Sequence, residues 1–307
     1  LIIYFILVLT FGFTLLTSDI AIGRRTHKSA IGAYEQMRPK WKGLGILTFL
    51  VPVLIMTYYA VIGGWITKYA VVYVSGQASA AAADDYFTSF ITSPVSPVVF
   101  ALLFMGVTAL IVYNGVQNGI EKVSRWMMPV LLVLVVVIAC YSLTLSHTNA
   151  DGQVVTGWQG FLYYLTPNLE GLTVQRFLQI LLDAMSQLFF SLSVSMGIMI
   201  TYGSYVRPEV DLNRAVNQIE IFDTGVAFLA GMMIIPAVYV FSGTEGMGAG
   251  PSLMFVSLPK VFAAMGRAGT AVGILFFVTA IFATLSSCIS VLESITANCM
   301  EIFHTSR

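Results

Sequence analysis

Long apolar runs separated by short polar stretches dominate the pattern of this chain. Each run approaches or exceeds the roughly 20 residues that an α-helix needs to cross the hydrocarbon core of a bilayer. The pattern predicts seven spans, at residues 1–22, 44–74, 97–113, 126–145, 184–206, 219–241 and 271–300. The longer connection at residues 146–174 contains WQGFLYYLTP, where we expect a short surface helix. The sequence therefore predicts an all-α polytopic membrane protein.

The fifth run, AMSQLFFSLSVSMGIMITYGSYV, contains no charge but is not an ordinary span. Ser191, Ser193 and Ser195 alternate with apolar residues, and Gly197 follows. At about 100° per residue, neighbouring serines in this row point roughly 200° apart and share no helix face. An unwound segment at residues 191–196 would turn them toward one site, and such backbone is tolerated at membrane depth where it lines a cavity. The alternative is a plain span whose small residues pack against neighbouring helices.

Composition supports a membrane protein and argues against several other classes. The 307 residues are 57% hydrophobic and 10% charged, whereas soluble domains carry about 25% charged residues. The net charge is zero, so no basic surface argues for nucleic acid. The three cysteines form no CxxC pair, and HExxH, Walker and GxSxG motifs are absent from the sequence. We read the GMGAG stretch as a turn, and nothing in the sequence supports an enzyme.

The basic residues predict the orientation of the spans, because cytoplasmic loops are rich in Lys and Arg. With the loop at residues 24–42 inside, the eleven inner basic residues are Arg24, Arg25, Lys28, Arg38, Lys40, Lys42, Lys122, Arg125, Arg207, Arg214 and Arg307. The four outer ones are Lys68, Arg176, Lys260 and Arg267. The chain is therefore expected to start outside and end inside.

Asp223 and Asp19 are two of the acidic residues that lie within or near the predicted spans. An acid inside a span costs about 2.5–3.5 kcal/mol on insertion scales, so Asp223 is expected to face a cavity, a cation or a proton path. Alternatively, Asp223 lies close enough to the interface to reach water. Asp19 is nearer the interface, and we interpret it as structural.

Spans seven and two carry further oxygen groups. In FATLSSCISVLE, the carbonyl of Ala283 and the hydroxyls of Ser286 and Ser287 fall on one helix face and form half a cage for a hard cation. Packing through small hydroxyl residues is the alternative, and Glu293 has no place in this hypothesis. In LIMTYYAVIGGW, Ile55 and Tyr59 share a face. The tyrosine hydroxyl could bind a substrate carboxylate or simply belong to aromatic packing.

Several segments together resemble the neurotransmitter:sodium symporter family, whose bacterial members include the leucine transporter. They are the GR ending span one, the TYY…GGW of span two, the QLFFSLSVSMG…TYGSYV of span five and the LSSCISVLE of span seven. The resemblance covers nearly the whole chain and implies a partial leucine-transporter fold, with two inverted repeats and a midplane site. Residues 1–307 would form a single transmembrane domain fragment, from the second to the eighth helix of the family fold. The chain begins inside an apolar run without Met, so we expect truncation at both ends. The family's first helix, which supplies backbone ligands to both sodium ions and the substrate, would be missing.

The resemblance assigns roles residue by residue. The implied substrate-binding residues are Ile55, Tyr59, Phe190, Ser191, Ser193, Met196, Ser287 and Val291. The implied sodium ligands are Ser191 and Asp223 in the first site and Ala283, Ser286 and Ser287 in the second. Tyr59 and Phe190 match the outer gate, and Tyr205 and Glu301 match the inner gate. Ser195 stands where many relatives carry Gly, a departure that could narrow the pocket or stiffen the break.

The resemblance also bears on chloride, which animal members require. Tyr4, Gln187 and Asp223 match the neighbourhood of the halide site. Asp223 stands where animal members and the leucine transporter carry Asn. Because an Asp could supply the negative charge itself, we predict that this protein does not require chloride.

The implied function is sodium-coupled symport of an amino acid by alternating access, in the plasma membrane (the inner membrane of a bacterium). The apolar pocket walls favour a hydrophobic or aromatic substrate. The alternative is a non-transporting membrane scaffold or an inactive truncated fragment. An ion channel would need a continuous polar stripe, which spans one, three and four do not show. The sequence makes no prediction about the oligomeric state.

Overall fold

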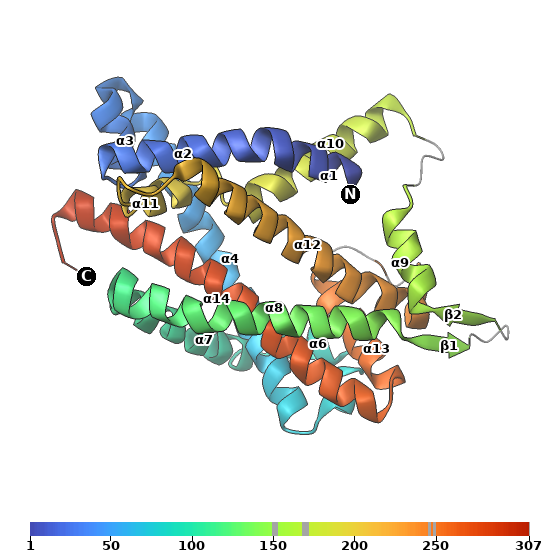
Figure 1. Ribbon diagram of the computed structural model, residues 1–307. Coiled ribbons are helices and arrows are strands. Elements are labelled where there is room, and N and C mark those ends of the chain that lie inside the picture. The colour runs from blue at the N-terminus through green and yellow to red at the C-terminus, as the bar shows by residue number, and fades with distance from the viewer. Residues whose placement is uncertain (149–152, 168–171, 245–246, 248–249, 307) are drawn as a thin grey trace.

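Long helices, most of them running along one direction, form the body of the protein (Figure 1). The computed structural model describes residues 1–148, 153–167, 172–244, 247 and 250–306. Six of its continuous helical stretches are long and apolar enough to cross a membrane: Ile2–Thr26, Pro39–Val74, Ser96–Tyr113, Val116–Leu143, Leu212–Ser242 and Arg267–Phe303. Each coincides with a predicted span, and the remaining predicted span is interrupted.

The first half of the chain contains four of these stretches. The first consists of α1 (Ile2–Leu7), the π-helical turn η1 (Val8–Gly12) and α2 (Phe13–Thr26). Next come α3 (Ala30–Met37), η2 (Pro39–Trp41) and the 33-residue α4 (Lys42–Val74). The short helices α5 (Ala78–Ala81) and α6 (Tyr86–Thr92) precede α7 (Ser96–Tyr113), and η3 (Val116–Glu121) continues into α8 (Lys122–Leu143).

The second half begins outside the main bundle. Strands β1 (Ser146–Thr148) and β2 (Val154–Thr156) form an antiparallel hairpin that leads into α9 (Gly157–Leu165). The interrupted span consists of α10 (Val174–Ser191) and α11 (Ile198–Ser204). It is followed by α12 (Leu212–Ser242), η5 (Leu253–Ser257), α13 (Leu258–Ala264) and the 37-residue α14 (Arg267–Phe303).

Six of the seven predicted spans are confirmed as helices long and apolar enough to cross a membrane, but several boundaries were placed too far inside the helices. The stretch at residues 114–125 was predicted to be a loop, yet the helix already begins at Val116, after Gly115 with φ +80°. Likewise α12 begins at Leu212, because the side chain of Asp211 caps the amides of Asn213 and Arg214. Both helices therefore begin with a polar turn that precedes the apolar run used to predict the span. The expected short helix in the long connection is α9, while its hairpin was not predicted.

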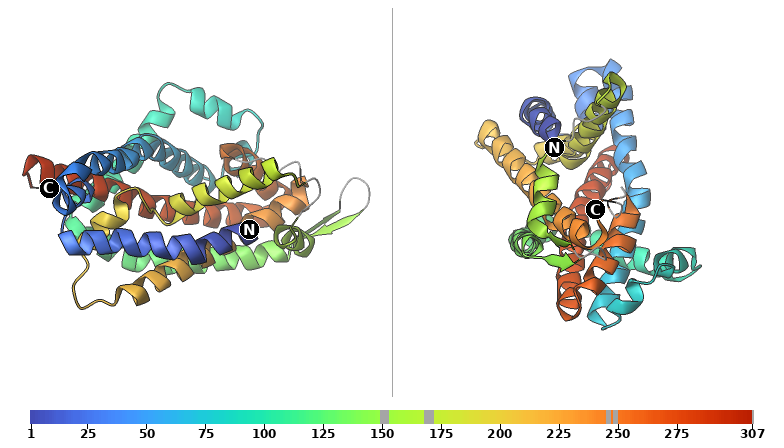
Figure 2. Two further views of the ribbon diagram at one scale, coloured as in Figure 1. Left: turned by 90° about the horizontal axis from the view of Figure 1, so that it is seen from above. Right: turned by 90° about the vertical axis from the view of Figure 1, so that its right-hand side faces the viewer.

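Two groups of helices pack on opposite sides of the molecule. Figure 2 shows α1, α2 and α10 together on one side, and α6 and α7 on the other. A core that includes Leu16, Leu188 and Leu192 joins the first group to α12. A second core, which includes Phe104 and Ile289, joins α4, α7, α8 and α14. The candidate site lies between these two groups.

Close packing of α4 on α7 requires glycine at two adjacent positions. A Cβ atom on Gly64 would lie 2.5 Å from the backbone nitrogen of Ala101. A Cβ atom on Gly63 would lie 2.3 Å from the ring of Phe104. Because backbone atoms cannot move aside as a flexible side chain can, Gly64 fixes the distance between the two helices.

We therefore expect Gly64→Ala to push α4 away from α7. The cost should be about 1–3 kcal/mol of unfolding free energy, the usual penalty of overpacking. Reversible unfolding of the detergent-solubilised protein measures it. The matched control is Gly106→Ala on α7, where a Cβ atom meets nothing within 4 Å. Equal stability of the two variants would contradict this account of the α4–α7 contact.

Candidate functional site

The interruption between α10 and α11 confirms the predicted break at residues 191–196. Helix α10 ends at Ser191, and α11 begins only at Ile198. Between them, Ser193 (φ +52°), Ser195 (φ +60°) and Gly197 (φ +74°) adopt the left-handed backbone conformation. Left-handed residues at alternate positions prevent the chain from continuing as a right-handed helix. A plain span packed through small residues is therefore excluded.

Neighbouring elements hold this unwound segment in place. The buried carboxylate of Asp19 on α2, with 6% of its surface exposed, accepts a hydrogen bond of 2.7 Å from the amide of Ser195. Leu192 and Val194 are buried in the core shared with α1 and α2. Gly197 lies so close to α3 that a Cβ atom would approach the Cβ of Ala30 to 2.9 Å. Asp19, which we interpreted only as a structural residue, thus binds the break directly.

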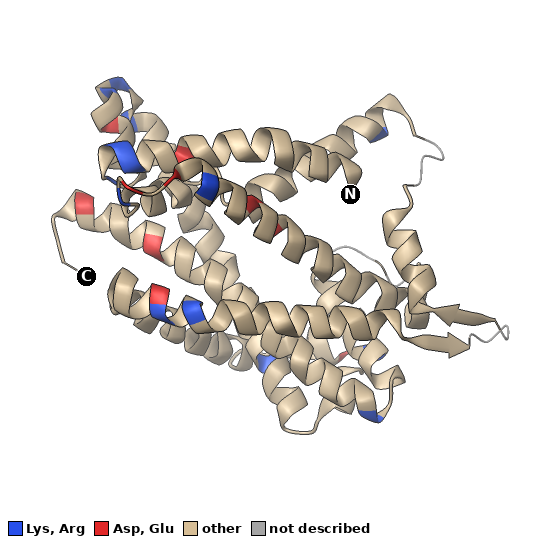
Figure 3. Ribbon diagram, in the orientation of Figure 1, with Lys and Arg blue, Asp and Glu red and all other residues tan. Residues whose placement is uncertain are grey.

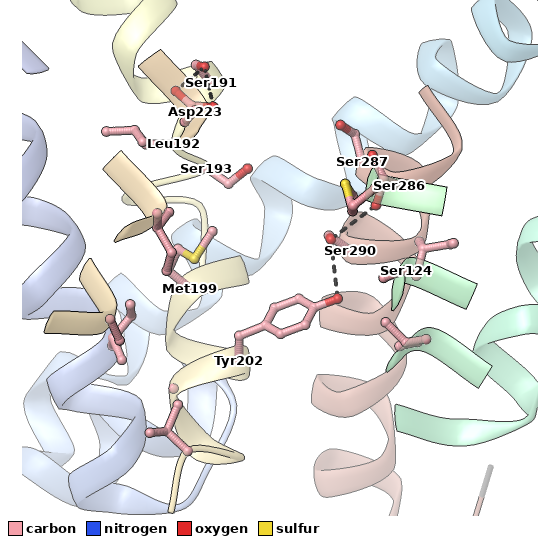
Figure 4. Close-up of a pocket in the computed structure, with 18 of the residues that line it drawn as sticks. Ser124, Ser191, Leu192, Ser193, Met199, Tyr202, Asp223, Ser286, Ser287 and Ser290 are labelled. Atoms are coloured by element: carbon pink, nitrogen blue, oxygen red, sulfur yellow. Dashed lines mark hydrogen bonds between the residues drawn. The ribbon is translucent and has the colours of Figure 1, made fainter. Parts of the chain in front are cut away.

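Asp223 also reaches the break. The hydroxyl of Ser191 lies 2.9 and 2.8 Å from the two carboxylate oxygens of Asp223 and donates to them (Figure 4). This contact fixes the end of α10 to α12. Asp223 faces cavities lined by α10 and α14, which favours the cavity interpretation over contact with water at the interface.

A cavity of about 240 Å³ opens beside the break. Its lining residues are Ile55, Tyr59, Gln187, Phe190, Ser191, Ser193, Met196, Ile198, Asp223, Ser287 and Val291. All eight residues that the resemblance implied for substrate binding are among them. The rings of Tyr59 and Phe190 lie 5.9 Å apart, and Tyr59 and Ser287 line the same cavity. The cavity therefore combines apolar walls with a few hydroxyl groups and one carboxylate, as small-molecule sites commonly do.

Oxygen atoms of α14 gather across the space from the break (Figure 4). The hydroxyl of Ser286 lies 2.8 Å from the carbonyl oxygen of Ala283, to which it donates, and Ser287 lines the cavity one residue later. Within the described residues, no group of three or more His, Cys, Asp or Glu side chains could hold a metal ion. Carbonyl and hydroxyl oxygens suit a hard cation such as sodium better than a transition metal. The residues on α14 fit a sodium ion, although they supply only part of a ligand shell.

A larger cavity of about 510 Å³ adjoins the first one. Both are lined by Ser191, Ser193, Asp223 and Ser287, so they meet at the break. The larger cavity extends between α11 and α12 on one side and α8 and α14 on the other, past Ser124 and Ser290 (Figure 4). Across it, the hydroxyl of Tyr202 lies 3.2 Å from that of Ser290.

Comparison with known proteins identifies the family of this chain. The profile of the sodium:neurotransmitter symporter family matches residues 1–88 and 90–307. The chain belongs to this family. It is therefore a multi-pass membrane protein of the plasma membrane.

Two relatives and one solved structure are similar to this symporter-family chain over nearly its whole length. It is 35% identical to YhdH, an uncharacterized sodium-dependent transporter of Bacillus subtilis, over 96% of this chain and 63% of the relative. It is 31% identical to an uncharacterized sodium-dependent transporter of Methanocaldococcus jannaschii, over 99% of this chain and 63% of the relative. The chain thus spans about 63% of the length of these relatives. Its structure is similar to MhsT solved in complex with L-phenylalanine, with a TM-score of 0.84 and 35% identity, covering 99% of this chain and 67% of that one.

The residues implied for the symporter's inner gate make separate contacts. The hydroxyl of Tyr205, the residue directly after α11, donates to a carboxylate oxygen of Glu293 at 2.7 Å. Glu301 instead accepts a hydrogen bond of 2.6 Å from the amide of Ser29, at the start of α3. Glu293, which our sequence hypothesis left unexplained, therefore links α14 to the half-helix after the break. A gating role for Tyr205 and Glu301 stays a prediction.

The implied halide neighbourhood is divided between two cavities. Tyr4 and Gln187 line a separate cavity of about 200 Å³, whereas Gln187 and Asp223 line the cavity beside the break. The Tyr4 hydroxyl lies near Ser191 and Asp223 but forms no hydrogen bond with a described residue. Asp223, the only carboxylate among Tyr4, Gln187 and Asp223, accepts its hydrogen bonds from Ser191.

We expect the bond between Asp19 and the break to contribute to stability. Asp19→Ala leaves the amide of Ser195 without its acceptor, which should cost about 1–3 kcal/mol. Asp19→Asn retains a carbonyl oxygen and should recover most of this loss. Asp183→Ala, an exposed acid on α10, is the control and should change stability by less than about 0.5 kcal/mol. Unfolding measurements in detergent that rank Asp19→Ala with the control would contradict the assigned role.

Proposed function

We propose that the protein carrying this chain couples sodium entry to the uptake of an amino acid by alternating access. The observation that supports this most strongly is the cavity beside the break, where Ser193 points across the space toward Ser287 on α14 and Ser191 contacts Asp223 (Figure 4). The site combines hydroxyl groups, one carboxylate and unwound backbone at membrane depth. This combination suits binding of small polar ligands rather than covalent chemistry.

The substrate we propose is an amino acid with a hydrophobic or aromatic side chain. The Tyr59 hydroxyl would donate a hydrogen bond to the substrate carboxylate, and Phe190 would lie above the substrate. Ile55, Met196 and Val291 would surround the side chain, and they offer no charge that could compensate a buried ionic group. The binding of L-phenylalanine by the similar protein MhsT supports this choice.

Sodium is the second substrate, and we propose two sites for it. The first uses Ser191 and Asp223, whose carboxylate would bind the ion directly and take the place of a bound chloride. The second uses the carbonyl of Ala283 and the hydroxyls of Ser286 and Ser287. Ser191 ends α10 and Ser193 follows two residues later in the unwound segment, so an ion held at Ser191 would also position the substrate contact at Ser193. The membrane potential would add about 2.3 kcal/mol per charge per 100 mV to inward movement.

Access from the inside would depend on the half-helix α11. In this structure Tyr202 and Tyr205 connect α11 to Ser290 and Glu293 on α14. Breaking these contacts would allow α11 to move away from α14 and widen the larger cavity toward the inner end. The rival hypotheses, a non-transporting scaffold or an inactive fragment, require no such movement and no ion dependence.

The first test is uptake of radiolabelled phenylalanine and leucine by the full-length protein in proteoliposomes. We expect uptake to require an inward sodium gradient. Ser287→Ala should raise the sodium concentration for half-maximal uptake about tenfold, the effect of losing one ligand worth about 1.4 kcal/mol. Ser124→Ala, at a hydroxyl that lines the larger cavity but is not among the proposed ion ligands, should behave like the wild type. Folded protein without uptake under a sodium gradient would favour the scaffold.

A second test concerns the charge of Asp223. Wild-type uptake should be unchanged when chloride is replaced by gluconate. Asp223→Asn removes the fixed negative charge beside Ser191 but preserves the size of the side chain. Uptake by this variant should fall and should recover partly when chloride is added. Wild-type uptake that depends on chloride would contradict the proposal.

A further inference from the structure

One buried acid on α12, Glu220, has no part in the proposed function. Its side chain is 5% exposed, and its Oε1 atom is buried and accepts no hydrogen bond from a described residue. Within the described part of the chain, Glu220 also takes part in no ion pair. Because the described helices already cover it, a further segment of the full-length protein would find almost no surface of Glu220 to contact. Its burial needs a physical reason, since an unpaired carboxylate is costly to remove from water.

Apolar groups enclose the carboxyl group of Glu220. A Cβ atom added to Gly12, in the π-helical turn η1, would lie 3.5 Å from Oε1 of Glu220. The same Cβ atom would lie 2.9 Å from a methyl group of Leu192 and 3.7 Å from one of Leu188. Val216, about one turn earlier on α12, is buried in the core that these leucines share with α1 and α2. The carboxyl group therefore faces an apolar core, and the side chains beside it offer no hydrogen bond.

The charged groups nearby do not neutralise Glu220. In the described elements around it (α1, η1, α2, α10 and α12), the other titratable side chains are Tyr4, Asp19, Arg24, Arg25, Arg176, Asp183, Arg214, Asp223 and Tyr239. The four arginines lie near helix ends, where three are exposed and Arg24 donates to the carbonyl of Val210 at 2.7 Å (Figure 3). The nearest charge along α12 is the carboxylate of Asp223, three residues later, at a Cβ separation of about 5–6 Å.

This position suits a proton better than a metal ion. None of the three cavities described around the break is lined by Glu220, although Ile219 and Asp223 line the largest of them. A metal cation needs several oxygen ligands and the space to hold them, whereas a proton needs a single carboxylate oxygen. Two acids one helical turn apart also repel each other when both are ionised, so the ionised form of Asp223 favours a neutral Glu220.

We propose that Glu220 is a proton-binding site linked to sodium binding at Asp223. Without sodium, Glu220 carries a proton as a neutral carboxylic acid. A sodium ion held by Asp223 offsets the repulsion between the two acids, so the O–H bond of Glu220 breaks and the proton passes to water in the larger cavity. Because linkage is reciprocal, sodium binds more tightly as the pH rises. The linkage rests on the proposed sodium site, whereas the bound proton rests on the burial of Glu220.

Infrared difference spectroscopy of the purified full-length protein tests the bound proton without any transport. In potassium at about pH 7, the wild type should show the carbonyl band of a protonated carboxylic acid, and Glu220→Gln should remove it. Gln has the size of the neutral acid, so this variant should fold. Glu209→Gln, at an exposed acid before α12, is the matched control and should retain the band. A spectrum in which Glu220→Gln removes no such band would overturn the proton site.

Binding of radiolabelled sodium at about pH 6 and about pH 9 tests the linkage. The gain in sodium affinity between these pH values should be at least about fivefold larger in the wild type than in Glu220→Gln. An equal gain in both proteins would assign the pH dependence to Asp223 and overturn the linkage. Loss of sodium binding in Glu220→Gln at both pH values, with no protonated band in the wild type, would make Glu220 a sodium ligand instead. A wild type that shows the band but binds no sodium would overturn the sodium site and the linkage together, and would leave the proton on Glu220 established.

Discussion

The central constraint on this molecule is the unwound backbone between Ser191 and Ile198. Peptide groups freed from a helix cannot be solvated by hydrocarbon, so they must find partners in the protein or line a cavity that admits polar ligands. Asp19 supplies such a partner for the amide of Ser195. The other side of the segment lines the cavities shared with Asp223 and Ser287. The break and the candidate site are therefore consequences of the same local sequence.

This segment also connects two parts of the fold that pack separately. Leu188 and Leu192 belong to the core of α1, α2 and α12, whereas Ile198 packs with α4, α7, α8 and α14. The position of the break thus depends on both cores. A ligand that contacts Ser193 and Ser287 together would change how the two cores pack around the break. An ion at Ser191 would act on the same packing through α12. In this arrangement, the proposed coupling between ion and substrate would require no long pathway.

Much of this could be predicted from the sequence. Charge-free runs of sufficient length identify the spans, and the alternation of Ser191, Ser193 and Ser195 conflicts with helical periodicity strongly enough to locate the break. The pocket residues followed from several motifs matched together. The sequence could not reveal the partner of Asp19, because the contact joins residues 176 positions apart. Nor could it reveal that Glu293 binds Tyr205, since helix spacing defines a face but not the residue across from it. Helix ends were misplaced wherever a cap such as Asp211 lies beyond the apolar run.

The proposed function depends on sodium and the substrate binding together at the broken helix. Equilibrium binding of radiolabelled phenylalanine to the purified full-length protein, in sodium and in potassium at equal ionic strength, tests it most directly. The account predicts saturable binding in sodium, at least tenfold weaker binding in potassium, and loss of the sodium effect in Ser191→Ala. Saturable binding of equal affinity in both salts would contradict it.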